Sequence, residues 1–101
     1  MNELSNKALI LLDILKRLGA TDEKHRTNIY EILKKLEEVN FQEILPEEPD
    51  YELENLECEM TQKSVSTTLA SLVRKGLVNK TGINSVQVGE TIKNLREYYL
   101  A

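Results

Sequence analysis

The hydrophobic period of the chain changes at Gly76, and this change constrains the fold more than any other feature. Before the glycine, apolar side chains recur at the spacing of one helix face, at Val65, Leu69, Leu72 and Val73. A glycine at this point suits the left-handed backbone conformation in which helices commonly end. The pattern predicts a helix over residues 61–75 that stops at Gly76.

The residues after the glycine have the composition of a short β-hairpin. Two apolar pairs, Leu77/Val78 and Val86/Val88, flank a turn-forming Gly82-Ile83-Asn84. We therefore predict a hairpin over residues 77–88 with its turn at residues 82–84. A return to helical spacing then predicts a final helix over residues 89–101, with Ile92, Leu95 and Tyr99 facing inward.

The first twenty residues predict a strongly apolar helix that ends near Gly19. One face carries Leu4, Ala8, Leu11, Leu15 and Leu18, and Leu9, Ile10, Leu12 and Ile14 widen it. A helix that is apolar over most of its circumference must be buried on two sides. We expect the core to cover one side and a partner chain to cover the other.

A further helix is expected to begin near Thr21 or Thr27, with Ile29, Ile32, Leu33 and Leu36 on its inner face. Pro46 and Pro49 exclude a continuous helix through the acidic stretch that follows. Residues 50–58 fit either a short helix or an ordered loop.

With 101 residues, the chain is long enough for one domain, residues 1–101, which we expect to be mainly α with a small β-hairpin. The single cysteine, Cys58, cannot form an internal disulfide, which favours a reducing compartment. The early apolar run is too short for a signal peptide or a membrane span. These features predict a soluble, cytoplasmic protein without a membrane partner.

The charges are divided unevenly along the chain. Residues 1–60 contain fifteen acidic and seven basic residues, whereas residues 61–101 contain six basic and two acidic residues. The segment Glu43–Glu59 alone has eight acidic residues and no basic one. This asymmetry predicts a dipolar surface that could present its basic end to a polyanion.

The outer face expected for helix 61–75 is rich in hydroxyl groups. Ser64, Ser66, Thr67 and Thr68 are four hydroxyl residues within five positions, although Ser and Thr weaken helices. A helix that enters the DNA major groove must be slim and must offer hydrogen-bonding groups without carboxylates. A hydroxyl-rich face without function remains the alternative interpretation.

The run from Thr61 to Val78, with the hairpin after it, resembles the recognition helix and wing of winged helix-turn-helix regulators. The resemblance rests on Val65-Ser66, on Leu69 and Leu72 three apart, and on Lys75-Gly76-Leu77-Val78. The order of the predicted elements is similar to that of MarR-type regulators, and the loop before the helix at residue 61 is similar to that of PadR-type ones. The resemblance implies a winged helix with an extra N-terminal and a C-terminal helix.

This resemblance implies a homodimeric, sequence-specific regulator of transcription, most simply a repressor, that binds double-stranded DNA. The residues implied in DNA contacts are Thr61, as the helix cap, and Gln62, Lys63, Ser64, Ser66, Thr67, Ser71, Arg74 and Lys80. The residues expected in the dimer interface are Leu4, Ala8, Leu11, Leu15, Ile92, Leu95 and Tyr98.

Two alternatives remain open. The segment Arg26–Tyr30, with Lys34, also resembles the start of a recognition helix, but no glycine and hairpin follow it. The chain could instead be a winged-helix interaction module that docks a basic protein on Glu43–Glu59, without binding DNA.

Nothing in the sequence predicts an enzyme, a cofactor or a metal site. His25 is the sole histidine, and Cys58 lies between Glu57 and Glu59, which disfavour its thiolate. The acidic stretch also lacks the spacing and the glycine of a calcium-binding loop. We expect His25 and these carboxylates to be solvated side chains.

Overall fold

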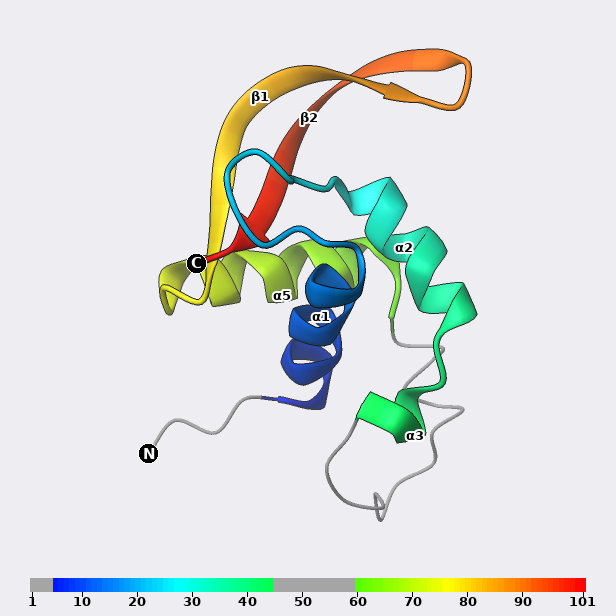
Figure 1. Ribbon diagram of the computed structural model, residues 1–101, viewed down its shortest axis with the longest axis vertical. Coiled ribbons are helices and arrows are strands. Elements are labelled where there is room, and N and C mark those ends of the chain that lie inside the picture. Colours follow the sequence, from blue (N-terminus) through cyan, green and yellow to red (C-terminus); the bar gives the residue numbers. More distant parts are fainter. Residues whose placement is uncertain (1–4, 45–59) are drawn as a thin grey trace.

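The computed structural model describes residues 5–44 and 60–101 and has an α+β fold (Figure 1). Its three longer helices are α1 (Asn6–Arg17), α2 (Ile29–Glu38) and α5 (Gln62–Arg74), and a short α3 (Phe41–Ile44) follows α2. The antiparallel strands β1 (Val78–Val88) and β2 (Thr91–Leu100) form a hairpin after the helices. The predicted order of helices followed by a hairpin is confirmed, but no helix follows the hairpin.

Helix α1 forms the centre of the core. Ser5 caps it, because its Oγ accepts a hydrogen bond from the amide of Ala8 at 3.2 Å. The side chains of Ile10, Leu11 and Ile14 are fully buried, and the helix contacts α2, α3, α5 and β2. The chain's own elements therefore cover much of the apolar surface that we expected a partner chain to cover.

Helix α2 begins at Ile29, later than Thr21 and just after Thr27. The reason is Asn28, whose Oδ1 accepts hydrogen bonds from the amides of Tyr30 at 3.0 Å and Glu31 at 3.1 Å. Asn28 is buried, so two amides at the helix end receive a partner inside the protein. This cap fixes the point at which the chain leaves the loop and enters α2.

The hairpin is longer than predicted. Residues 82–84 lie inside β1, and the turn is at Gly89 and Glu90, between the paired residues Val88 and Thr91. Gly89 has a φ of 62° at the first central position of the turn, as a type II′ turn requires. In Figure 1 the hairpin rises from the end of α5 and arches over α2.

The predicted C-terminal helix over residues 89–101 is wrong, because these residues form β2. Thr91, Ile92, Tyr98 and Tyr99 are all residue types that favour strands, and β1 supplies a hydrogen-bonding partner along the whole segment. The helical spacing of Ile92, Leu95 and Tyr99 is therefore overridden by pairing with residues distant in the sequence.

A β-bulge explains why Gly82-Ile83-Asn84 does not form the turn. The register shifts between Lys80 and Ile83, and the extra residue in β1 leaves the amide of Glu97 to donate to Thr81 Oγ1 at 3.0 Å. The Glu97 carboxylate accepts from Asn84 Nδ2 at 3.4 Å and lies 3.6 Å from Arg26 Nη2. The bulge is thus held by side chains and linked to the loop before α2.

The base of the hairpin is joined to the loop between α1 and α2. Thr27 and Tyr98 exchange two backbone hydrogen bonds, of 2.9 and 2.7 Å, in an isolated antiparallel bridge. The amide of Leu100 donates to the carbonyl of Ala20 at 2.8 Å. The loop therefore acts as a short third strand along β2 and fixes the hairpin to the helices.

No helix within residues 5–44 and 60–101 is long and apolar enough to span a lipid bilayer.

Candidate nucleic-acid interface

Helix α5 buries one face and leaves the other in solvent. Thr61 caps it by accepting a hydrogen bond from the amide of Ser64 at 3.3 Å, as expected. Val65, Leu69 and Leu72 are almost fully buried against the core. The exposed residues of the helix are Gln62, Lys63, Ser66, Thr67, Ala70 and Arg74, and Ser64 and Ser71 are half-buried.

The hydroxyl groups of α5 are not all directed to solvent. Thr67 Oγ1 donates to the carbonyl of Lys63 at 3.0 Å, and Thr68 Oγ1 donates to that of Ser64 at 2.9 Å. Such bonds to the preceding turn satisfy the hydroxyl hydrogen within the helix. Thr67, which is exposed, can still accept a hydrogen bond and presents its methyl group, whereas half-buried Thr68 belongs partly to the packed side.

The charges of α5 are all positive. Lys63 lies in its first turn, Arg74 in its last and Lys75 at its C-terminal cap, and all three are exposed. No acidic residue occurs in the helix. The outer surface of α5 therefore combines hydrogen-bonding groups with cations at both ends, and it would not repel a phosphate backbone.

The hairpin adds cations that the sequence interpretation largely missed. On one of its faces, exposed Lys80 lies near Ile83, which is paired with exposed Arg96. Arg96 escaped notice because the predicted C-terminal helix gave it no place beside Lys80. The alternation of β2 and its register with β1 would have been the signal that brings the two cations together.

The remaining charges of the hairpin are partly engaged within the chain. Lys93 Nζ lies 3.4 Å from the hydroxyl of Tyr30 and 5.0 Å from the centre of its ring. The side chain of Glu97 is only 16% exposed and faces Arg26, so its carboxylate adds little negative charge to the surface. Glu90, at the turn, is exposed.

The structure corrects part of the expected dimer interface. Ala8, Leu11 and Leu15 are buried inside the chain, because α1 packs among the chain's own helices and β2. These three side chains are therefore not available to a second copy.

The other residues expected in the dimer interface are spread over the fold. Leu4 lies outside the described residues. Leu95 and Tyr98 are half-buried on β2, and Ile92, near the turn of the hairpin, is 70% exposed. The structure thus does not bring the expected set together on one surface.

The second candidate recognition segment, Arg26–Tyr30, is largely internal. Thr27, Asn28 and Ile29 are buried, and the Asn28 side chain serves as the cap of α2. Lys34 is exposed further along α2. A helix start that is closed in this way cannot present its first residues to DNA.

The groups considered for chemistry lie apart or outside the described residues. His25 is exposed, and its Nδ1 lies 2.8 Å from Asp22 Oδ1, a hydrogen bond that lowers the pKa of the Asp22 carboxyl. Cys58, and all of Glu43–Glu59 except its first two residues, lie outside the described residues. Among residues 5–44 and 60–101, no three His, Cys, Asp or Glu side chains are grouped as metal ligands would be.

Comparisons with protein-family models, with curated proteins and with solved structures gave no match.

Proposed function

We propose that this chain is a winged-helix regulator that binds double-stranded DNA with helix α5 in the major groove. The observation that carries the proposal is the outer face of α5, which is exposed, has no carboxylate and has cations at both ends. The hairpin that follows α5 supports it, because Lys80 and Arg96 add cations next to this helix in the position of a wing.

In the proposed complex, the residues of α5 divide into two roles. Gln62, Ser66 and Thr67 supply side-chain donors and acceptors that can reach base edges. Lys63, Arg74 and Lys80 supply positive charge for phosphates, and the free amides at the start of α5 face the same backbone. Ser64 and Ser71, which are half-buried, have a smaller share in these contacts.

The proposal includes a homodimer, which would read two half-sites about 34 Å apart. Such a complex on a promoter would repress transcription by excluding the polymerase. The second copy needs an apolar surface that the core leaves open, and the outer side of α1 offers one. Half-buried Leu9 and Leu12 line a hollow of about 370 Å³ together with Leu77 and Leu100.

The decisive experiment starts from duplexes selected from a random pool by the purified protein. We expect Lys63→Ala and Arg74→Ala each to weaken binding and to reduce the slope of log Kd against log salt concentration by about 0.9. Both side chains are exposed, so the melting temperature should stay close to that of the wild type.

Lys24→Ala is the matched control, since Lys24 is an exposed cation in the loop between α1 and α2. Its variant should bind with the wild-type salt slope. If the two α5 variants bind as the wild type does, α5 is not the DNA-reading helix. If no duplex is enriched and no salt-sensitive binding appears, the chain does not bind DNA.

A further inference from the structure

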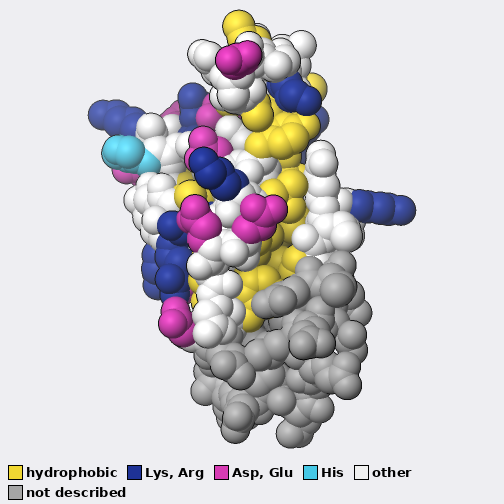
Figure 2. All heavy atoms as spheres, turned by 90° about the vertical axis from the view of Figure 1, so that its right-hand side faces the viewer, with side chains coloured by type: hydrophobic (Ala, Val, Ile, Leu, Met, Phe, Trp, Pro, Cys, Tyr) yellow, Lys and Arg dark blue, Asp and Glu magenta, His cyan; other side chains and the backbone are white. Residues whose placement is uncertain are grey.

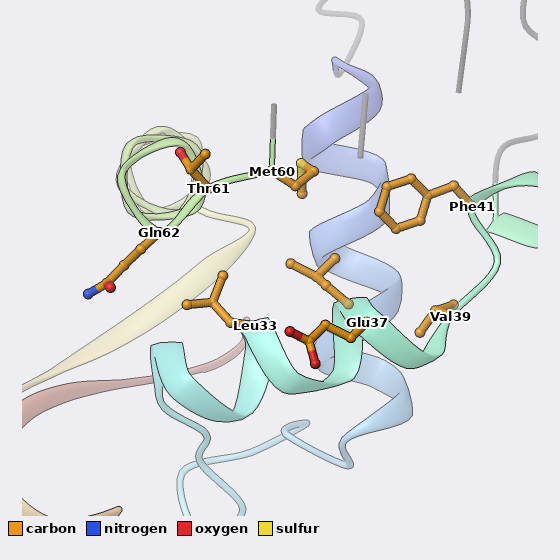
Figure 3. A pocket seen from close by; sticks show the side chains of 8 residues that line it. Leu33, Glu37, Val39, Phe41, Met60, Thr61 and Gln62 are labelled. Atoms are coloured by element: carbon orange, nitrogen blue, oxygen red, sulfur yellow. The ribbon is translucent and has the colours of Figure 1, made fainter. Parts of the chain in front are cut away.

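A second hollow lies where α2 faces the start of α5. It is a cleft of about 550 Å³, a size that suits a small organic molecule. Its residues are Leu33, Leu36, Glu37, Val39, Phe41, Met60, Thr61 and Gln62. Figure 3 shows Leu33 and Glu37 on α2 across from Met60 and Thr61, where the chain enters α5.

The lining is mainly apolar. Leu36, Phe41 and Met60 are buried at its floor and sides, and Leu33 and Val39 are half-buried. In Figure 2 hydrophobic side chains form a band on this side of the molecule, from the hairpin down to the border of the undescribed residues. The cleft can therefore remove the apolar body of a ligand from water.

The charge of the lining has one sign. Among the described residues that line the cleft, Glu37 is the only charged one, and it is exposed at the opening. The neighbouring Glu38 carboxylate is 3.5 Å from Lys35 Nζ, so a cation of the same helix already faces it. Glu37 is thus the group that selects the charge of a ligand, and it favours a cation over an anion.

We propose that this cleft binds a small organic cation with an apolar body, whose charge lies at Glu37 and whose body lies among Leu33, Phe41 and Met60. The site adjoins the cap of α5, because Thr61 both lines the cleft and accepts the hydrogen bond that begins the helix. On the proposed function, occupancy of the cleft changes the position of α5 relative to α2 and thereby changes DNA affinity. By linkage, DNA then changes ligand affinity by the same factor.

The test uses two ions of nearly the same size and shape and of opposite charge, tetraphenylphosphonium and tetraphenylborate. With isotope-labelled full-length protein, the phosphonium should shift the amide signals of Leu33, Glu37 and Thr61, and the borate should leave them in place. Glu37→Gln should weaken phosphonium binding about threefold, since a single exposed charge pair is worth at most about that much. Glu31→Gln, which removes an exposed carboxylate of the same helix outside the cleft, should bind as the wild type does.

The site is refuted if the phosphonium leaves these signals unshifted, if both ions shift them equally, or if Glu37→Gln binds with unchanged affinity. The regulatory part is measured separately, as the Kd of a selected duplex with and without saturating phosphonium. An unchanged Kd overturns regulation and leaves the proposed function intact. If the chain binds no DNA, the proposed function and the regulation fail together, while the titration of the amide signals still decides whether the site exists.

Discussion

At the scale of single residues, two buried polar side chains at the start of α2 differ in how well they are satisfied. Asn28 accepts two amide hydrogen bonds, whereas Thr27 Oγ1 has no hydrogen-bond partner among the described residues. A buried hydroxyl without a partner costs free energy, although the backbone of the same residue is fully paired with Tyr98.

We expect Thr27→Val to stabilise the fold by about 1 kcal/mol, because valine has nearly the same shape, favours strands and has no hydroxyl to satisfy. Chemical denaturation should show the free energy of unfolding rise in Thr27→Val and fall in Asn28→Ala, where a used cap is lost. A decrease in both variants would mean that the Thr27 hydroxyl has a partner in solution.

Asp22 makes stability depend on pH in the acid range. Its carboxyl has a pKa below its ordinary value of 3.8, chiefly because of the hydrogen bond with the His25 side chain and secondarily because the amides of Lys24 and His25 donate to it. The unfolded state then binds this proton more readily than the folded state does, so the contribution is present above pH 3.8 and is lost as the pH falls through the folded pKa.

Asp22→Asn keeps the acceptor for the two amides and does not titrate. We therefore expect the difference in unfolding free energy between the wild type and Asp22→Asn to shrink as the pH falls below 3.8. Urea denaturation at several pH values measures this difference. A difference that stays constant from neutral pH to the lowest pH at which both fold would contradict the assignment.

At the scale of elements, the sequence predicts the helices well because their information is local. The predicted helix over residues 61–75 corresponds closely to α5, Gln62–Arg74, since its apolar stripe, its Thr61 cap and Gly76 lie within the element itself. The hairpin depends instead on pairing between distant residues. A bulge at Lys80/Ile83 and a turn at Gly89 have no local signature strong enough to compete with Gly82-Ile83-Asn84.

The same distinction applies to the candidate site. The exposure of Gln62, Lys63, Ser66, Thr67 and Arg74 follows from helical period and is predicted correctly. The placement of Arg96 near Lys80 follows from strand register, which the sequence interpretation had wrong. Whether these residues contact DNA remains a prediction that the salt-slope experiment decides.

The bulge gives a prediction for the hairpin as an element. Thr81→Val removes the hydroxyl that accepts from the amide of Glu97 and should destabilise the fold by about 1 kcal/mol. Amide hydrogen exchange should quicken at Glu97 and near it more than in α1 or α5. Thr91→Val, at the exposed far end of β2, is the control and should leave exchange at Glu97 unchanged. Equal exchange in both variants would show that the Thr81 side chain does not hold the bulge.

At the scale of the whole molecule, the helices and the hairpin share one core, and two of its outer surfaces compete as the site of the proposed dimer. One is the hollow beside Leu12 on α1, and the other is the outer face of the hairpin with Ile92, which is 70% exposed. The hollow also contains Asp13 and Lys16, so it presents charges of both signs, as a two-fold symmetric interface can use.

We expect Leu12→Glu to convert the dimer into a monomer and Ile92→Glu to leave it a dimer. Leu12 is half-buried at the hollow, so its variant is checked for an unchanged circular dichroism spectrum. Sedimentation equilibrium over a range of protein concentrations measures the mass. A dimer that persists in Leu12→Glu and dissociates in Ile92→Glu would assign the interface to the hairpin, and a monomeric wild type would remove the dimer from the proposal.

The bridge between Thr27 and Tyr98 has a mechanical consequence. Beyond this attachment the paired strands project as a lever arm, and the eleven residues of β1 span about 35 Å. A tilt of about 10° at the attachment would carry the far end through about 6 Å, which is comparable with the width of a minor groove. A few backbone hydrogen bonds at the pivot thus govern where the end of the arm can reach.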